Sequence, residues 1–323
     1  MRDFATDFNG HCVAAHCLAD AALFAMADGT IRGPDDEGEG IRAHSALLAA
    51  APMRQEGALL SGGEDGRVCR TSATGDVVEV ARVPRKWITS VAAAASGNIA
   101  WSSGRSVWLR SATGEIRELP HKRSVRAIAL SADGTRLAVA QQDWIAIHAA
   151  SKELESIELQ WSGTHSALVF SPDARYLLVA TQDNALHGWR LQDRQHMRMV
   201  GYQARVGDWS WSADGALLAT SGAASAIVWP FDGSNGPIGR TAIELGKREG
   251  NVVTAVACHP TDASLAIGYS DGALQVAGFD ASPATVVRPG GRGAVTSMSW
   301  HKDGRFLVFG SALGECGAVH VAR

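Results

Sequence analysis

The sequence has few of the features that mark secreted, membrane-embedded or disulfide-stabilised proteins. Its five cysteines are an odd number, and their spacing matches no disulfide framework. We therefore expect reduced thiols and a cytoplasmic location. The first ten residues lack the basic and apolar regions of a signal peptide. No apolar run approaches the roughly 20 residues that a membrane helix requires, so we expect no membrane contact.

Residue patterns that support catalysis are also missing. The sequence contains neither a Gly-x-Ser-x-Gly nucleophile elbow nor a Gly-x-x-x-x-Gly-Lys phosphate loop. No pair of carboxylates stands at a spacing suited to acid–base catalysis. The formal net charge of -3 argues against nucleic-acid binding. These observations predict a protein that is not an enzyme, needs no cofactor and binds no nucleic acid.

What the chain has in abundance is short apolar segments separated by polar turns, together with 35 glycines and 10 tryptophans. One pattern recurs: an apolar run, a turn with Asp and often Gly, and a second apolar run, as in Ala127–Gly134 followed by Leu137–Ala140. We anchor each copy on one apolar residue of its first run. The anchors are Val13, Leu47, Val91, Ile128, Leu168, Trp209, Val256 and Met298.

The spacing of the copies predicts the fold class. Successive anchors are 34, 44, 37, 40, 41, 47 and 42 residues apart, close to the roughly 40–45 residues of a four-stranded propeller blade. No segment between anchors shows a sustained helical period. We expect an all-β, closed β-propeller of four-stranded antiparallel blades that forms a single domain over residues 1–323. Eight blades are favoured, with seven as the alternative because the first three copies are degenerate.

The strands of a blade can be assigned most clearly in the fifth copy. We expect its four strands at 166–170, 176–181, 185–191 and 196–200. The eighth copy ends after its third strand, at 318–321. The N-terminal segment 3–8 precedes the first copy and would supply the missing outer strand. Such pairing of the two chain ends would remove the exposed sheet edges.

The sequence resembles the WD-repeat β-propellers. The fifth copy carries the best match: His165 before its first strand, Thr181 in the second, Asp183 in the following turn and Trp189 in the third. The resemblance implies that these four side chains form a hydrogen-bonded tetrad inside the blade. A buried indole and a buried imidazole each need a partner, so the role is structural.

The other copies depart from the family pattern. None has the signature Trp-Asp pair, and the sixth has Ala223 where the turn Asp belongs. The second copy keeps His44 and Asp65 but has Thr71 in place of the tryptophan. The sequence is therefore similar to a divergent member of the family, whose subfamily the motifs leave open.

A cluster of histidines and cysteines offers one alternative function. His16, His259 and His301 each lie three residues after an anchor, in copies that become neighbours if the chain ends meet, and Cys17 and Cys258 adjoin two of them. Imidazole and thiolate are common zinc ligands. The competing interpretation is that these residues satisfy backbone groups in turns. We favour the turns, because adjacent blades place equivalent positions too far apart for metal bonds.

The main functional hypothesis rests on charge. Several connections between blades are basic, and they are expected on the same face as the turns between second and third strands. An acidic partner protein would be attracted to that face, and an exposed tryptophan or arginine there would be a typical anchor. We therefore expect a non-catalytic scaffold that is a monomer or part of a larger complex. The sequence does not identify its partner protein. The expected partner-binding residues are Trp87, Lys122, Arg123, Arg126, Arg205, Lys247 and Arg292. The alternatives are a metal-binding propeller and, least favoured, an enzyme with a site at the central channel.

Overall fold

The computed structural model describes residues 1–34, 36, 38, 40–151 and 156–321. Its regular structure is almost entirely β-strand, with one short 3₁₀ turn (η1, Arg54–Glu56) among the described residues. Within this part of the chain no helix is long and apolar enough to span a membrane. The all-β fold class predicted from the repeat is therefore confirmed.

The chain divides into two compact units, which we describe separately. Unit 1 comprises Met1–Ala27, Arg32–Gly40 and Met199–Arg323, and unit 2 comprises Asp28–Ile31 and Ile41–Arg198. The expectation of a single domain over residues 1–323 stays a prediction.

The strands group into repeats of four. Repeat 1 has β2 (Cys12–Leu18), β3 (Ala21–Met26), β4 (Thr30–Arg32) and β5 (Ile41–Arg42). Repeat 2 has β6 (Leu47–Met53), β7 (Ala58–Gly63), β8 (Arg67–Ser72) and β9 (Val77–Arg82). Repeat 3 has β10 (Ser90–Ala93), β11 (Ile99–Ser103), β12 (Ser106–Arg110) and β13 (Ile116–Pro120). Repeats 4 and 5 share one sheet of β14 (Ala127–Leu130), β15 (Arg136–Ala140), β16 (Gln142–Ala149), β17 (Ile157–Phe170), β18 (Tyr176–Thr181), β19 (Leu186–Arg190) and β20 (Gln195–Met199).

The remaining strands continue the same pattern. Repeat 6 has β21 (Trp209–Trp211), β22 (Leu217–Thr220), β23 (Ala226–Pro230) and β24 (Ile243–Leu245). Repeat 7 has β25 (Val253–Cys258), β26 (Ser264–Tyr269), β27 (Leu274–Gly278) and β28 (Thr285–Arg288). Repeat 8 has β29 (Val295–Trp300), β30 (Phe306–Ser311) and β31 (Glu315–His320), with β1 (Phe4–Asp7) as its fourth strand. We call the four strands of each repeat a to d, in the order in which they are paired.

Burial explains why each strand position has its own composition. The b strand β18 is buried at every residue, and its sequence is almost continuously apolar. The outer d strand β13 instead alternates between exposed and half-buried residues. A strand covered on both faces needs an unbroken apolar run, whereas a strand with one wet face alternates. The core therefore lies along the a, b and c strands, and the outer strands and turns contact solvent.

The turns between a and b strands are held by a short side-chain motif. In repeat 4, Ser131 donates its hydroxyl to Asp133, and Asp133 accepts the backbone N–H of Thr135 at 3.0 Å. An aspartate that accepts hydrogen bonds two residues along the chain stabilises a tight turn. The same Ser-x-Asp arrangement occurs at Ser171 and Asp173 and at Ser212 and Asp214.

The number of blades depends on how β17 is counted. Hydrogen bonds connect the described strands into seven sheets, six with four strands and one with seven. In the seven-stranded sheet, Ile157–Gln160 and Thr164 of β17 pair with β16, and His165–Phe170 pairs with β18. One continuous strand thus replaces the loop between repeats 4 and 5. Eight four-stranded units are present, as the anchors predict, while the count of continuous sheets is seven.

Two of the predicted anchors are out of register. In repeat 7 a bulge between Val253 and Ala255 immediately precedes the anchor Val256. The equivalent bulges lie between Cys12 and Ala14 in β2 and between Leu47 and Ala49 in β6. The true equivalents of Val256 are therefore Ala15 and Ala50 rather than Val13 and Leu47. Both strands are rich in alanine, so the apolar pattern alone does not show which alanine or neighbouring residue is equivalent to the anchor of another repeat.

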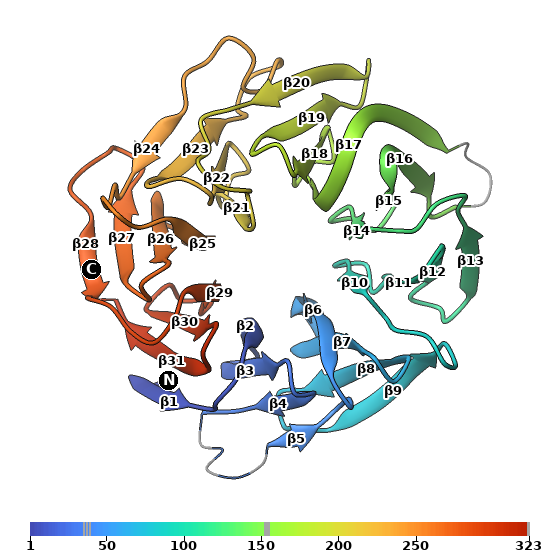
Figure 1. Cartoon of the computed structure of the whole chain (residues 1–323), viewed down its shortest axis with the longest axis horizontal. Helices are drawn as coiled ribbons and strands as arrows, with labels where there is room; N and C mark the ends of the chain where they lie inside the picture. The colour runs from blue at the N-terminus through green and yellow to red at the C-terminus, as the bar shows by residue number, and fades with distance from the viewer. Residues whose placement is uncertain (35, 37, 39, 152–155, 322–323) are drawn as a thin grey trace. The chain divides into compact units, whose positions relative to one another are not determined.

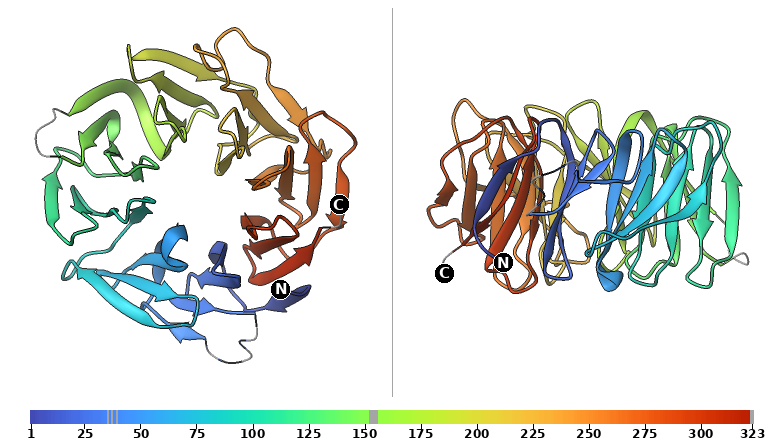
Figure 2. Two further views of the ribbon diagram at one scale, coloured as in Figure 1. Left: turned by 180° about the vertical axis from the view of Figure 1, so that it is seen from behind. Right: turned by 90° about the horizontal axis from the view of Figure 1, so that it is seen from below.

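The N-terminal strand completes repeat 8, as predicted. Strand β1 pairs antiparallel with β31, with Phe4 opposite Ala318 and Asp7 opposite Glu315. Figure 1 and both views of Figure 2 show β1 lying along β31. Arg292 forms an ion pair with Asp7 beside this contact. The pairing supplies hydrogen-bond partners to the outer edge of β31 and so removes an exposed edge.

Phe8 connects this N-terminal segment to the core of unit 1. It is 8% exposed, and its ring lies 5.8 Å from that of Phe24 in β3. We expect Phe8→Ala to lower the free energy of unfolding by about 3–5 kcal/mol, because a large aromatic side chain leaves a cavity. Chemical denaturation monitored by tryptophan fluorescence measures this change. The matched control Val286→Ala, at a 49% exposed outer-strand position, should change it by less than about 0.5 kcal/mol. Similar losses in the two variants would contradict the role of the segment.

Candidate protein-binding surface

The tetrad predicted in repeat 5 forms only in part. His165 donates its Nδ1–H to the carbonyl of Gln141 at 2.7 Å and not to Asp183. Asp183 instead accepts from the hydroxyl of Thr181 and lies 3.5 Å from Nε2 of His187. Trp189 is buried at 4% exposure, as expected of a core residue. The single four-residue network expected here is thus replaced by two separate groups of contacts.

Repeat 2 contains the connected network. His44 Nδ1 lies 3.1 Å from Asp65 Oδ1, and its Nε2 lies 2.8 Å from Ser61 Oγ. Burial lowers the pKa of His44, and hydrogen bonding to Asp65 partly opposes this effect. The neutral ring donates to Asp65 and accepts from Ser61, so both nitrogens are satisfied.

The spacing within repeat 2 explains the failure in repeat 5. Ser61 stands four residues before Asp65, whereas the residue four positions before Asp183 is Val179. Valine has no hydroxyl, so His165 finds a backbone carbonyl instead. Thr181, two residues before Asp183, is at the wrong position to reach the histidine. A search for Ser or Thr at the four-residue spacing would have selected repeat 2.

Repeat 6 has a related network that the sequence analysis missed. The indole N–H of Trp229 donates to the hydroxyl of Tyr202 at 2.7 Å. That hydroxyl lies 2.9 Å from Thr220 Oγ1, which donates to the carbonyl of Ile227. Burial raises the pKa of Tyr202 to about 12. Tyr202 thus takes the place of the histidine, which a search limited to histidine could not find.

The proposed metal ligands do not converge. His259 accepts the backbone N–H of Asp262 at 2.9 Å and donates Nε2–H to the carbonyl of Gly304 at 3.0 Å. His301 lies 2.9 Å from Asp20 and 2.6 Å from Asp303. Both histidines therefore bind groups of turns, as the competing interpretation expected.

The other members of the predicted metal cluster lie in strands. His16 lies opposite Leu23 in the middle of a strand pair, because the register of β2 places its anchor at Ala15. It is therefore not equivalent to His259 and His301, and Cys17 follows it within β2. Cys258 donates its thiol to the carbonyl of Ser210 at 3.3 Å, and burial raises its pKa to about 12. Across the described residues, no group of three His, Cys, Asp or Glu side chains could hold a metal ion. The five predicted ligands therefore form no metal site in the described part of the chain.

Unit 2 has two basic loops, and both lie at the strand ends that carry the turns between b and c strands. The first, residues 83–89, is held by hydrogen bonds from Val83 to Gly66 and from Ile88 to Gly63. The second, residues 120–126, is held by hydrogen bonds from His121 to Arg105 and from Val125 to Gly104. Both loops therefore rest on the turns between b and c strands, as predicted for connections between blades. We call residues 83–89 and 120–126 the basic loops.

The side chains of the basic loops are largely free to meet a partner. Trp87 is 58% exposed, which is the largest exposed fraction among the large apolar side chains of the described residues. Lys122 and Arg126 are exposed. Arg123 forms an ion pair with Asp143 at 2.9 Å, which offsets part of its charge. The loops thus combine an exposed indole with exposed cations.

The three predicted residues in unit 1 differ from one another. Arg205 and Lys247 are exposed in connections before repeats 6 and 7. Arg292 is instead engaged, since its guanidinium pairs with Asp7 and its backbone N–H donates to Glu315 at 2.7 Å. Arg292 therefore has a structural role at the β1–β31 contact. A single face that includes all seven predicted residues stays a prediction.

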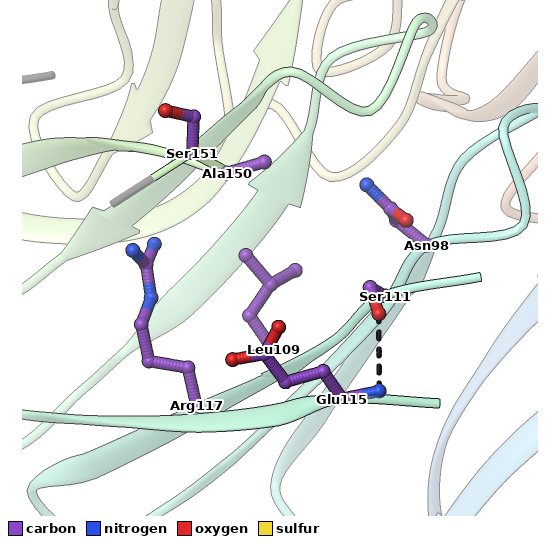
Figure 3. Close-up of a pocket in the computed structure, with 7 residues that line it drawn as sticks. All are labelled: Asn98, Leu109, Ser111, Glu115, Arg117, Ala150 and Ser151. Atoms are coloured by element: carbon purple, nitrogen blue, oxygen red, sulfur yellow. Dashed lines mark hydrogen bonds between the residues drawn. The ribbon is translucent and has the colours of Figure 1, made fainter. Parts of the chain in front are cut away.

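Two cavities lie in unit 2. One, of about 350 Å³, is shown in Figure 3, where Arg117 extends toward Ser151 and Ser111 accepts the backbone N–H of Glu115 at 3.1 Å. The other, of about 360 Å³, we call the loop pocket. Its lining residues are Pro120, His121, Lys122, Arg123, Gln141, Trp144, Ile145, Ala146, His148, Ser156 and Glu158. Two of the predicted partner-binding residues, Lys122 and Arg123, thus border a hollow.

The chain resembles known proteins in one repeat and in its fold. Residues 284–318 match the family model described as "WD domain, G-beta repeat". No curated protein matches the sequence. Among solved structures, a chain of the crystal structure of the mitotic checkpoint complex is similar, with a TM-score of 0.67 and 17% identity, over 86% of this chain and 90% of that chain. As many as 1760 solved chains match, and a fold so widely shared does not identify a function.

The network of repeat 2 generates a stability prediction. Ser61→Ala should lower the free energy of unfolding by about 1–3 kcal/mol, because it leaves the buried Nε2 of His44 without its partner. Chemical denaturation compares this variant with Ser45→Ala, an exposed serine beside the same histidine. Ser45→Ala should have an effect below about 0.5 kcal/mol. Equal effects of the two changes would show that the His44–Ser61 contact contributes nothing.

Histidines of unit 2 generate a prediction about pH. Burial lowers the pKa of a set of them, reaching about 4 for His148. The set is His44, His121, His148, His165, His187 and His196. The folded state binds protons on these rings less readily than the unfolded state does. Their contribution to stability is therefore complete above pH about 6.5 and decreases as the pH falls toward the folded-state values.

Asp208 in unit 1 has the opposite dependence, because burial raises its pKa to about 6 and acid favours its folded form. We expect acid to open unit 2 before unit 1 between about pH 6.5 and 4.5. Amide hydrogen exchange, corrected for intrinsic rates, measures both units in one sample. Earlier loss of protection in unit 1, or equal loss in both, would contradict the assignment.

Proposed function

We propose that this chain, which belongs to the WD-repeat family and has its propeller fold, is a non-catalytic scaffold that docks an acidic partner protein through the basic loops of unit 2. WD-repeat propellers typically serve as platforms for protein interactions. The similar chain in the crystal structure of the mitotic checkpoint complex is itself part of an assembly of proteins. These two facts support a protein partner in general, and the choice of surface is ours.

The observation that carries the proposal is the exposure of Trp87 among cations. A tryptophan that is 58% exposed next to exposed Arg85 and Lys86 contributes little to the core. At protein interfaces, tryptophan and arginine are the residues that most often dominate the binding energy. Exposed cations additionally speed encounter with an acidic surface. The combination therefore suits docking better than stability.

The remaining parts of the proposal follow the same reasoning. Lys122, Arg123 and Arg126 extend the basic surface of unit 2, and Arg205 and Lys247 are exposed cations of unit 1. Arg292 contributes least, because its charge is already paired with Asp7. All five cysteines are free thiols, which suits the cytoplasmic location that we propose.

The test compares proteins recovered with two variants of equal charge change. The loop variant carries Lys122→Glu, and the control carries Arg194→Glu. Arg194 is exposed in a turn at the opposite strand ends. We omit Arg123, because reversing it would place two negative charges beside each other at Asp143.

We expect the loop variant to recover at least about tenfold less of the main partner, while the control recovers it as the wild type does. Quantitative mass spectrometry of material purified from the native cell gives both numbers. Trp87→Ala should reproduce most of the loss without any change in charge. A partner that remains bound to all three variants would remove the basic loops from the interface.

A further inference from the structure

The loop pocket contains a hydrogen-bond chain that fixes one proton. The backbone N–H of Arg123 donates to Oε1 of Gln141 at 3.3 Å. The amide oxygen of Gln141 is thereby used, and its amide nitrogen lies 3.3 Å from Nδ1 of His121. An amide nitrogen can only donate, so Nδ1 of His121 accepts. The proton of the neutral His121 ring is therefore on Nε2.

That Nε2–H has no acceptor among the residues that the structure describes. The His121 Nε2 atom is buried, and within the described residues it has no hydrogen-bond partner. His148 packs edge-on against the His121 ring, with ring centroids 5.2 Å apart, and its buried Nε2 likewise lacks a described partner. Buried polar groups in proteins are nearly always satisfied, and an exception points to a missing ligand or ordered water. Both imidazoles line the loop pocket.

The charges around the pocket favour an anion. Lys122 and Arg123 contribute cationic side chains to the lining, while Glu158 is the carboxylate among the described lining residues. Lys122 forms no ion pair with a described residue, whereas Arg123 already pairs with Asp143. Burial lowers the pKa of His148, and the positive charges of His121 and Arg117 lower it further. An oxygen anion in the pocket would meet one oriented N–H donor and the ammonium group of Lys122.

The size of the pocket limits what it can hold. A volume of about 360 Å³ is near the lower end of ligand pockets, which range from about 300 to 1,000 Å³. Trp144, Ile145 and Ala146 supply an apolar wall that suits the methylene groups of a side chain. One fixed donor and one ammonium match the two oxygens of a carboxylate. A phosphate would leave more oxygens without donors, and Glu158 would oppose its second charge.

We infer that the loop pocket binds the side-chain carboxylate of a glutamate or aspartate in an acidic segment of a partner protein. The inference rests on the proposed function, because Lys122 belongs both to the pocket and to the basic loops. It names the group that the partner would insert there. In the bound state the carboxylate accepts from His121 Nε2–H and lies beside the Lys122 ammonium group.

The test uses the full chain and three short peptides with blocked ends. The probe is Ser-Gly-Glu-Gly-Glu-Gly-Ser, its uncharged match replaces both glutamates with glutamine, and a third replaces one glutamate with phosphoserine. Binding is followed by NMR of the His121 imidazole and the Trp144 indole. We expect the glutamate peptide to shift both signals and to bind at least about tenfold more tightly than the glutamine peptide, because hydrogen bonds to ionised groups are the stronger kind.

Two variants keep the result interpretable. His121→Phe keeps the ring but removes the donor, and should weaken the glutamate peptide at least about fivefold, whereas the exposed control His11→Phe should not. Lys122→Gln changes an exposed side chain, so we expect the variant to fold as the wild type does. It should bind the glutamate peptide more weakly, and that binding should depend less on salt concentration. Equal binding of the glutamate and glutamine peptides, tightest binding of the phosphoserine peptide, or full binding to His121→Phe would each overturn the carboxylate assignment.

The outcome separates this inference from the proposed function. If the peptide binds the pocket but the loop variant still recovers its partner, the pocket stands and the docking surface fails. If the loop variant loses its partner but the glutamate peptide leaves His121 unshifted, the docking surface stands and the carboxylate pocket is rejected.

Discussion

The structure depends on one constraint: the buried third strand of each repeat must find hydrogen-bond partners along both of its edges. A repeat of four strands satisfies its inner members but leaves an outer edge, and repeat 8 supplies only three strands of its own. The pairing of β1 with β31 provides the fourth. Arg292 and Phe8 reinforce that contact, one by an ion pair and the other by burial against β3. The first residues of the chain are thus part of its last repeat.

The strands are needed for this pairing and for the core. The repeats therefore differ from one another mainly in their polar clusters and their loops. Repeats 2 and 6 solve the same problem with different residues, one through His44 and the other through Tyr202. These clusters are buried and stabilise individual repeats. The exposed side chains of Trp87, Lys122 and Arg126 lie outside these clusters, and we propose that recognition depends on them.

The sequence predicted the features that follow from periodic burial and missed those that depend on exact register. The four-stranded repeats, the strands of repeat 5 and the role of β1 follow from the apolar pattern and the length of the copies. The register of β2 and β6 was wrong because alanine-rich strands show little contrast, and that error placed His16 with two turn histidines. The tetrad was assigned to repeat 5 although Val179 stands where the hydroxyl is needed. The loop pocket could not be predicted, because it joins Gln141 and His148 to His121 through the fold alone.

We propose that rigid repeats hold the basic loops of unit 2 against a partner. Amide hydrogen exchange, measured on the free chain and on its complex with the partner recovered from the native cell, tests this most directly. We predict that binding protects residues 83–89 and 120–126 and leaves the slow exchange of the b strands unchanged. Protection confined to the turns between a and b strands, with the basic loops exchanging as in the free chain, would contradict the account.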